Sequence, residues 1–181
     1  PLYSSAASDV YKRQDELRFE AAKNRVIGIN RERQGSGTLS EKTVHAVLKN
    51  YYAPDTDMHE IPIENFVADI FTGTEIIEIQ TRSFQVMRRK LDAFLKIYPV
   101  TIVYPIPHVK WLLWIDEESG EMSPKRKSPK KGNPYVAFKE LYKIRPFLKN
   151  ENLRFRFALI DMEEYRLLNA VSYTHLRAHE T

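Results

Sequence analysis

The stretch "VADIFTGTEIIEIQTRSF", residues 67–84, sets acidic side chains within a run of aliphatic residues. Alternating apolar residues on both sides of Thr72 and Gly73 predict two strands joined by a turn. Side chains alternate between the two faces of a strand, so Glu78 and Gln80 share one face. This hairpin is therefore expected to organise both the sheet and the functional site.

The acids of the hairpin are predicted to share a face whichever turn joins the strands. A two-residue turn puts Asp69 opposite Ile76 and diagonal to Glu78, whereas a four-residue loop puts Asp69 directly opposite Glu78. In both registers the Cβ atoms of the two acids lie about 5–8 Å apart. Burying two such carboxylates costs several kcal/mol per ion, on the order of the usual desolvation penalty. A compensating cation is therefore expected.

Two kinds of cation fit this expectation. A hard divalent ion such as Mg²⁺ binds one or two carboxylates and leaves positions open for a phosphate. An arginine is the alternative, and Arg82 lies on the face of Gln80 if the strand continues that far.

The periodicity of the rest of the chain predicts helices and strands around this hairpin. Helices are predicted at 15–33, 38–54, 83–99, 135–148 and from 161 onward, and strands at 59–70, 74–81, 100–106, 110–116 and 153–161. A basic, proline-rich loop is predicted at 123–134. Strand pairs that alternate with crossover helices indicate an α/β fold, a mixed β-sheet flanked by helices.

The arrangement around the acids resembles the PD-(D/E)xK nuclease superfamily over roughly residues 38–115. In that superfamily an acid on one strand, a short hairpin and an acid-x-Lys strand follow a helix that carries Glu, and a crossover helix comes next. Asp69 matches the first acid, Glu78 the second, Gln80 the lysine position and Glu41 the acid of the helix. The resemblance implies a restriction-endonuclease-like core.

The resemblance also implies the roles of these residues. Asp69 and Glu78 are the expected metal ligands, with Mg²⁺ as the cofactor. Gln80 is expected to orient the attacking water, and Arg82 or Lys90 is expected to supply the positive charge that glutamine lacks.

Three residues near the hairpin have structural interpretations of their own. Thr38 and Glu41 have the spacing of a capping box, in which the glutamate bonds the start of its helix. His45 lies one turn further along and is expected to be hydrogen-bonded in the fold or to face the site. Glu75 falls on the opposite face from Glu78 and is expected at the surface.

Basic residues outside the hairpin are the candidates for contact with phosphates. They form two groups, one on the helix after the hairpin and one in the basic loop. The candidates are Arg88, Arg89, Lys90, Lys125, Arg126, Lys127, Lys130 and Lys131. A solvated surface is the alternative interpretation. Trp111 and Trp114 are predicted to pack in the core.

Both ends of the chain resemble translated sequencing-adapter sequence. We therefore expect residues 1–14 and 171–181 to be non-native tails around a single domain, 15–170, that is truncated at its C-terminus. Without these tails, 25 basic residues stand against 22 acidic ones, a mildly basic balance. The sequence has no cysteine, which excludes disulfides and thiolate metal sites. No apolar run is long enough to span a bilayer, so a cytoplasmic protein is expected.

These observations predict a nucleic-acid-binding protein that hydrolyses phosphodiester bonds with Mg²⁺, acting on DNA or RNA. One alternative is a non-catalytic binding or regulatory module on a degenerate nuclease scaffold. A second alternative is a protein interaction domain.

Overall fold

The computed structural model describes residues 3–31, 40–116, 118–129 and 132–168. Within these residues the chain forms four α-helices and a six-stranded mixed sheet. The α-helices are α1 (Tyr3–Arg31), α2 (Ser40–Tyr52), α3 (Arg88–Phe94) and α4 (Phe138–Lys143). The strands are β1 (His59–Ile63), β2 (Phe66–Phe71), β3 (Ile76–Ile79), β4 (Val100–Asp116), β5 (Arg126–Lys127) and β6 (Leu153–Leu168). Short 3₁₀ turns, η2 (Phe84–Met87) and η3 (Pro134–Ala137), lead into α3 and α4.

The chain divides into two compact units, whose boundaries fall inside β4 and β6. Unit 1 comprises Pro1–Pro105 and Ala137–Phe157, and unit 2 comprises Ile106–Val136 and Ala158–Thr181. The hairpin with the two acids belongs to unit 1, and the basic loop belongs to unit 2.

The sheet runs in the order β1-β2-β3-β4-β5, and β6 also pairs with β4. β1, β2 and β3 form an antiparallel meander, whereas β3 and β4 are parallel and are connected through α3. β3 is therefore an inner strand, and all four of its residues are buried. The predicted α/β class with a mixed sheet is confirmed.

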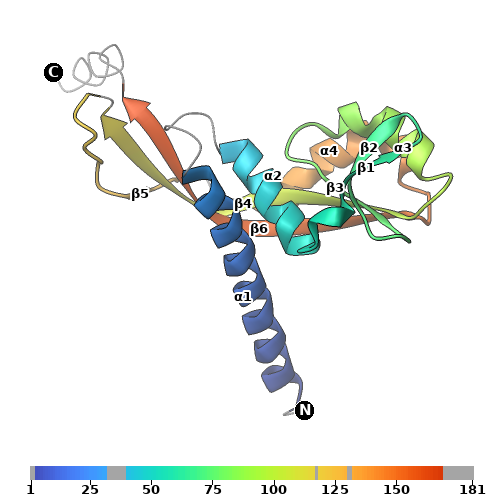
Figure 1. Cartoon of the computed structure of the whole chain (residues 1–181), viewed down its shortest axis with the longest axis horizontal. Coiled ribbons are helices and arrows are strands. Elements are labelled where there is room, and N and C mark those ends of the chain that lie inside the picture. The colour runs from blue at the N-terminus through green and yellow to red at the C-terminus, as the bar shows by residue number, and fades with distance from the viewer. Residues whose placement is uncertain (1–2, 32–39, 117, 130–131, 169–181) are drawn as a thin grey trace. The chain divides into compact units, whose positions relative to one another are not determined.

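The core of unit 1 lies between the sheet and the helical segments η2, α3 and α4. Phe84, Met87, Leu91 and Phe94 recur at helical spacing and are buried against strand residues such as Ile76. Figure 1 shows α3 and α4 beside β1, β2 and β3. This packing brings the N-terminal turn of α3 close to the buried strand β3.

The N-terminal helices have a small core of their own. Ala22 and Val26 of α1 are buried against Val47 of α2, and the helices predicted over 15–33 and 38–54 correspond to α1 and α2. α1 begins at Tyr3, well before the predicted start at Asp15. Among the described helices, none has the length and apolar character required to cross a bilayer.

The prediction of one strand over 59–70 is wrong. The chain turns back at Glu64 and Asn65, so that Ile63 pairs with Phe66 in a two-residue hairpin. Glu64 adopts a φ of 55°, the left-handed conformation that such tight turns require. Neither residue of this turn is a glycine or a proline, and the alternation of apolar residues continues across it. The sequence therefore gives no strong local signal that separates the two strands.

The prediction of two strands at 100–106 and 110–116 is also wrong. β4 is one continuous strand of 17 residues that passes through Pro105 and Pro107. Proline holds φ near −65° and lacks an N–H donor, but an extended backbone accommodates both properties where no ladder bond needs that donor. The Pro107 carbonyl still accepts a hydrogen bond from the Gly132 N–H, at 2.9 Å.

The prediction of a helix from residue 161 onward is the largest error. β6 instead continues to Leu168. Its acids have cationic partners within unit 2, because Lys110 donates to Glu164 at 2.7 Å and Lys125 pairs with Glu163. The predicted basic loop is likewise partly a strand, since Arg126 and Lys127 form β5.

Replacing Phe94 by alanine tests whether α3 is held by its apolar side. Phe94 is fully buried and meets the Phe66 ring edge-on, with 6.0 Å between centroids. We expect F94A to lower the free energy of unfolding by about 3–5 kcal/mol, as measured by urea denaturation. V86A, which truncates an exposed side chain next to α3, is the matched control. A loss below 1 kcal/mol in F94A would contradict this packing.

Candidate functional site

The β2–β3 hairpin has the register that a four-residue loop gives. Phe71 pairs with Ile76 and Ile70 with Ile77, so one further step along the strands places Asp69 opposite Glu78. Gly73 in the connecting loop has a φ of 91°, which glycine adopts without strain. The two acids therefore share a face, as expected from the alternation of the strands.

The ladder opens at this pair, and the two carboxylates take the place of backbone acceptors. The Asp69 N–H donates to Glu78 Oε1 at 3.2 Å, and the Ile79 N–H donates to Asp69 Oδ2 at 2.8 Å. A side chain on each strand thus satisfies a donor on the other. These bonds fix the position of both carboxylates and give each a structural role.

Two helices add one side chain each to this pair. Lys90 on α3 donates to Glu78 Oε2 at 2.7 Å, and His45 on α2 has Nε2 at 3.1 Å from Asp69 Oδ2. We call Asp69, Glu78, Lys90 and His45 the carboxylate cluster. All four residues belong to unit 1. The hairpin brings Asp69 and Glu78 together, whereas Lys90 and His45 reach them only because α3 and α2 pack near the hairpin.

The two carboxylates have opposite pKa shifts, although burial acts to raise both. Glu78 is only 4% exposed, and its burial, with the charge of Asp69, raises its pKa to about 7 despite the nearby Lys90 ammonium. Burial also acts to raise the pKa of Asp69, but the hydrogen bonds from His45 and the Ile79 N–H, with the charge of Lys90, outweigh it and lower that pKa. At neutral pH the pair therefore combines an ionised carboxylate with one close to its titration midpoint. Such a pair suits general acid–base chemistry.

Gln80 and Arg82 lie beyond the end of β3. The Gln80 amide donates through Nε2 to the Ser83 carbonyl at 2.7 Å, which stabilises the turn that leads into η2. Arg82 is expected on the acidic face only if the strand continues to it. The strand ends at Ile79, and the side chain of Arg82 is exposed. The cation that reaches Glu78 is Lys90.

The remaining acids near the hairpin are arranged differently. Glu41 lies within α2, but its side chain is outside the described residues, so its predicted cap and site role stay predictions. Glu75 is half-buried rather than at the surface, because it accepts a hydrogen bond from Thr101 and lies 4.0 Å from Arg154.

The two carboxylates of the cluster match a hard cation in kind, since carboxylate oxygens are the ligands that Mg²⁺ and Mn²⁺ prefer. In the described part of the chain, however, no three His, Cys, Asp or Glu side chains come together in a group that could hold a metal ion. Instead, Lys90 supplies the positive charge beside Glu78.

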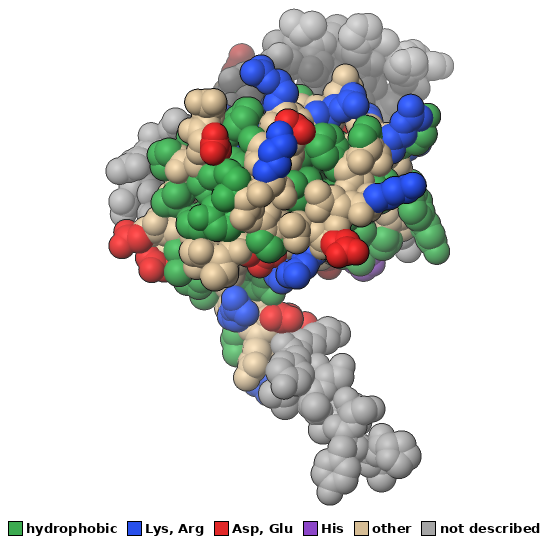
Figure 2. Space-filling model, turned by 90° about the vertical axis from the view of Figure 1, so that its right-hand side faces the viewer, with side chains coloured by type: hydrophobic (Ala, Val, Ile, Leu, Met, Phe, Trp, Pro, Cys, Tyr) green, Lys and Arg blue, Asp and Glu red, His purple; other side chains and the backbone are tan. Residues whose placement is uncertain are grey.

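The basic residues predicted to contact phosphates differ in their surroundings. Arg88 and Arg89 are exposed and line a shallow groove of about 600 Å³ that also includes Lys96 and Asp92. Lys90 points instead into the carboxylate cluster. Figure 2 shows basic, acidic and hydrophobic side chains intermixed on one face, without a broad field of positive charge.

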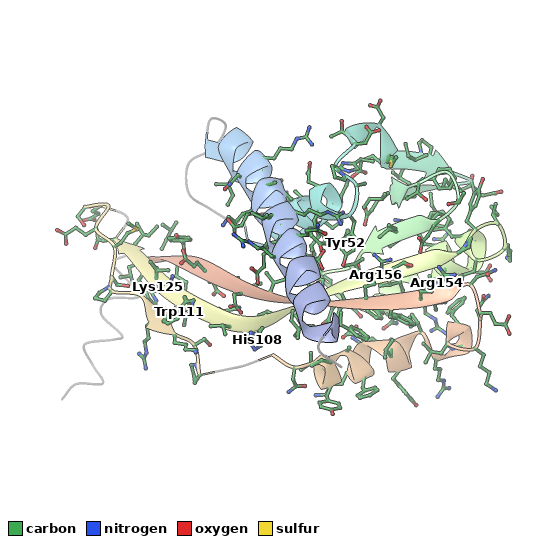
Figure 3. The ribbon with its side chains drawn as sticks, turned by 90° about the horizontal axis from the view of Figure 1, so that it is seen from below. Tyr52, His108, Trp111, Lys125, Arg154 and Arg156 are labelled. Atoms are coloured by element: carbon green, nitrogen blue, oxygen red, sulfur yellow. The ribbon has the colours of Figure 1, made fainter. Side chains whose placement is uncertain are left out.

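The basic segment of unit 2 contacts Trp111. The ammonium groups of Lys125 and Lys127 lie 5.1 and 5.7 Å from the centre of its ring, and Figure 3 shows Lys125 beside Trp111. Arg126 is exposed, whereas Lys130 and Lys131 lie outside the described residues.

The prediction that both tryptophans pack in the core is wrong. Trp111 and Trp114 are only partly buried, and Arg166 lies over the Trp114 ring at 5.9 Å. The described residues of unit 2 form no α-helix that could cover these rings. Their faces are therefore open to cations.

The raised pKa of Glu78 predicts how stability depends on pH. In the unfolded chain Glu78 ionises near pH 4.5, whereas in the folded chain it ionises near pH 7, so the folded state binds the proton more tightly. Stability is therefore lost as the pH rises from about 5 to 8, by an amount on the order of 3 kcal/mol. In E78Q this loss is expected to be absent. Urea denaturation at several pH values measures it, and parallel pH profiles for E78Q and the wild type would contradict the shift.

Comparison with known proteins places this chain in a family. Residues 42–181 match the model of a family described as a domain of unknown function, DUF8091. An uncharacterized protein of Treponema pallidum (strain Nichols) is 28% identical over 128 residues, an alignment that covers 70% of this chain and 50% of that protein. The chain thus spans about half the length of the curated relative it matches. No solved structure matches the chain. Since the family model covers most of the chain, including the whole carboxylate cluster, the protein belongs to the DUF8091 family.

Proposed function

We propose that this protein binds nucleic acid and hydrolyses phosphodiester bonds, with the carboxylate cluster as its active site. The observation that carries the proposal is the buried pair of Asp69 and Glu78 with the Lys90 ammonium 2.7 Å from Glu78 Oε2. Perturbed carboxylates beside a lysine are typical of catalytic sites. The order of elements supports the same conclusion, because a helix, the hairpin with its two acids, a crossover helix and a parallel strand follow one another here. That order is the one for which the resemblance to the PD-(D/E)xK superfamily implies a restriction-endonuclease-like core.

The carboxylates and the lysine of the cluster have roles in this proposal. Asp69 and Glu78 would contribute carboxylate oxygens to Mg²⁺, which would supply positive charge at the attacked phosphate and lower the pKa of a bound water. Lys90 places a fixed positive charge beside Glu78 and takes the role of the lysine that Gln80 replaces. Gln80 holds the turn after β3 through its bond to Ser83.

A non-catalytic nucleic-acid-binding module is the second candidate function. It is favoured by the hydrogen bonds that the carboxylates already accept, two from backbone N–H groups, one from Lys90 and one from His45. It is favoured also by the absence, among the described residues, of a group of three potential metal ligands. In this alternative the cluster stabilises the opened ladder, and the exposed arginines bind phosphates.

Hydrolysis of labelled single- and double-stranded DNA and RNA with Mg²⁺ or Mn²⁺ separates the two candidates. We expect K90M to lower the rate by about 10²–10³-fold, as loss of a fixed charge at a transition state does. D69N and E78Q are expected to lower it at least as much and to weaken Mn²⁺ binding in calorimetry. E75Q, which changes a half-buried acid outside the cluster, is the matched control and is expected to keep full activity.

Absence of hydrolysis and of metal binding, with nucleic-acid binding intact, would reject the enzyme and leave the second candidate. Absence of binding to every nucleic acid would reject both and favour the protein interaction domain.

The groove along α3 gives a separate prediction about binding. Arg88 and Arg89 are exposed at this groove, so each is expected to contact a phosphate. Each contact contributes about 0.9 to the slope of log K against log salt concentration. R88Q/R89Q should therefore reduce that slope by about 1–2 in fluorescence anisotropy titrations. K23Q on α1, where Lys23 pairs with Glu20, is the control, and an unchanged slope in the double variant would exclude the groove as a phosphate contact.

A further inference from the structure

Two aromatic side chains on α4 are unusually exposed to solvent. Phe138 is 63% exposed and Tyr142 is 67% exposed. Residues four apart on a helix lie on one face, with Cβ atoms about 5–6 Å apart. Figure 3 shows side chains of α4 that project away from the sheet. We call this surface of Phe138 and Tyr142 the α4 face.

An arginine holds one of these rings in place. The Arg145 guanidinium lies over the Tyr142 ring at 5.2 Å, and its NH1 group donates to the Tyr142 hydroxyl at 2.9 Å. The ring is therefore oriented before any partner binds, which lowers the entropy lost on binding. The same arginine places a positive charge beside an exposed aromatic surface.

The charges around the α4 face are mainly positive. Lys139, Arg145 and Lys149 are exposed in this segment. Glu140, an acid of the same helix, is turned inward, because it accepts hydrogen bonds from the Phe84 N–H at 2.9 Å and from Lys143 at 2.5 Å. The segment therefore favours an anionic partner.

The α4 face is anchored to the segment that leaves the carboxylate cluster. Lys143 donates to Ser83 Oγ at 3.0 Å, and Gln80, two residues after Glu78, donates to the Ser83 carbonyl. Together with the bond from the Phe84 N–H to Glu140, these contacts hold α4 against η2. A partner on the α4 face is thus held near the chain segment that follows the cluster.

Aromatic rings beside fixed cations have the chemistry that binds an unpaired nucleic-acid strand. Unpaired bases stack on aromatic side chains, and the adjacent phosphates attract lysine and arginine. In a duplex the faces of the bases are already stacked on one another, so the same rings gain little. We propose that the α4 face binds an unpaired strand, with bases stacked on Phe138 and Tyr142 and phosphates held by Lys139, Arg145 and Lys149. This inference deepens the proposed function and rests on its nucleic-acid-binding part.

Fluorescence anisotropy with a labelled oligothymidine and a duplex of equal length tests this assignment in the full chain. We expect the wild type to prefer the single strand. F138A/Y142A should weaken single-strand binding at least about tenfold and leave duplex binding within twofold, because each stacked base depends on its ring. F138Y, which keeps both rings and the contact of Arg145 with Tyr142, should retain the affinity of the wild type. Y165A, which removes a 55% exposed ring of unit 2, is the matched control.

The possible outcomes separate this inference from the proposed function. Unchanged single-strand affinity in F138A/Y142A, or equal affinity of the wild type for both polymers, overturns the inference and leaves the proposed hydrolase standing. Loss of affinity in F138Y overturns the stacking role of the rings. Failure of the wild type to bind any nucleic acid overturns both. If F138A/Y142A weakens only the binding of phosphatidylserine vesicles, the inference is overturned and the proposed hydrolase is left standing. The hydrolysis assay on D69N, E78Q and K90M tests the role of the carboxylate cluster independently of the α4 face.

Discussion

The buried carboxylate of Glu78 is the constraint on which much of unit 1 depends. β3 lies between β2 and β4, and the carboxylate of Glu78 on this inner strand has almost no access to solvent. Removing one ion from water costs on the order of several kcal/mol. The negative charge of the adjacent Asp69 adds electrostatic repulsion. Lys90 reduces this cost only if α3 docks with its first turn over the strand. The apolar side chains of α3, Leu91 and Phe94, provide that docking.

The carboxylates of Asp69 and Glu78 have a structural role besides their proposed chemical one. They accept hydrogen bonds from backbone N–H groups where the β2–β3 ladder opens. A pair of apolar residues with a continuous ladder is usually at least as stable as a buried ionic cluster. The raised pKa of Glu78 shows that its charged form is unfavourable in the folded protein. A fold that retains such a group is more readily understood if the group has a function, which is why the cluster, rather than the groove along α3, is the basis of the proposed activity.

Unit 1 also links its candidate site to its surface through a short chain of polar contacts. Gln80 bonds to Ser83, Ser83 bonds to Lys143, and Glu140 bonds to the backbone at Phe84. Gln80 is thereby part of the framework that positions α4. Its exchange for lysine would alter this connection. The curated relative is about twice as long as the region it shares with this chain.

The sequence by itself determined the features that depend on local periodicity. Alternation along strands placed Asp69 and Glu78 on one face under either turn, and helical stripes located α2, the helical segment of η2 and α3, and α4. It did not determine contacts between residues distant in the chain. Lys90 reaches Glu78 from twelve positions away, and Arg82, only four away, does not, because the strand ends at Ile79 and the apolar packing of α3 turns Lys90 inward. The continuation of β6 past residue 161 likewise depended on partners in β4 and the basic segment, which a local pattern cannot contain.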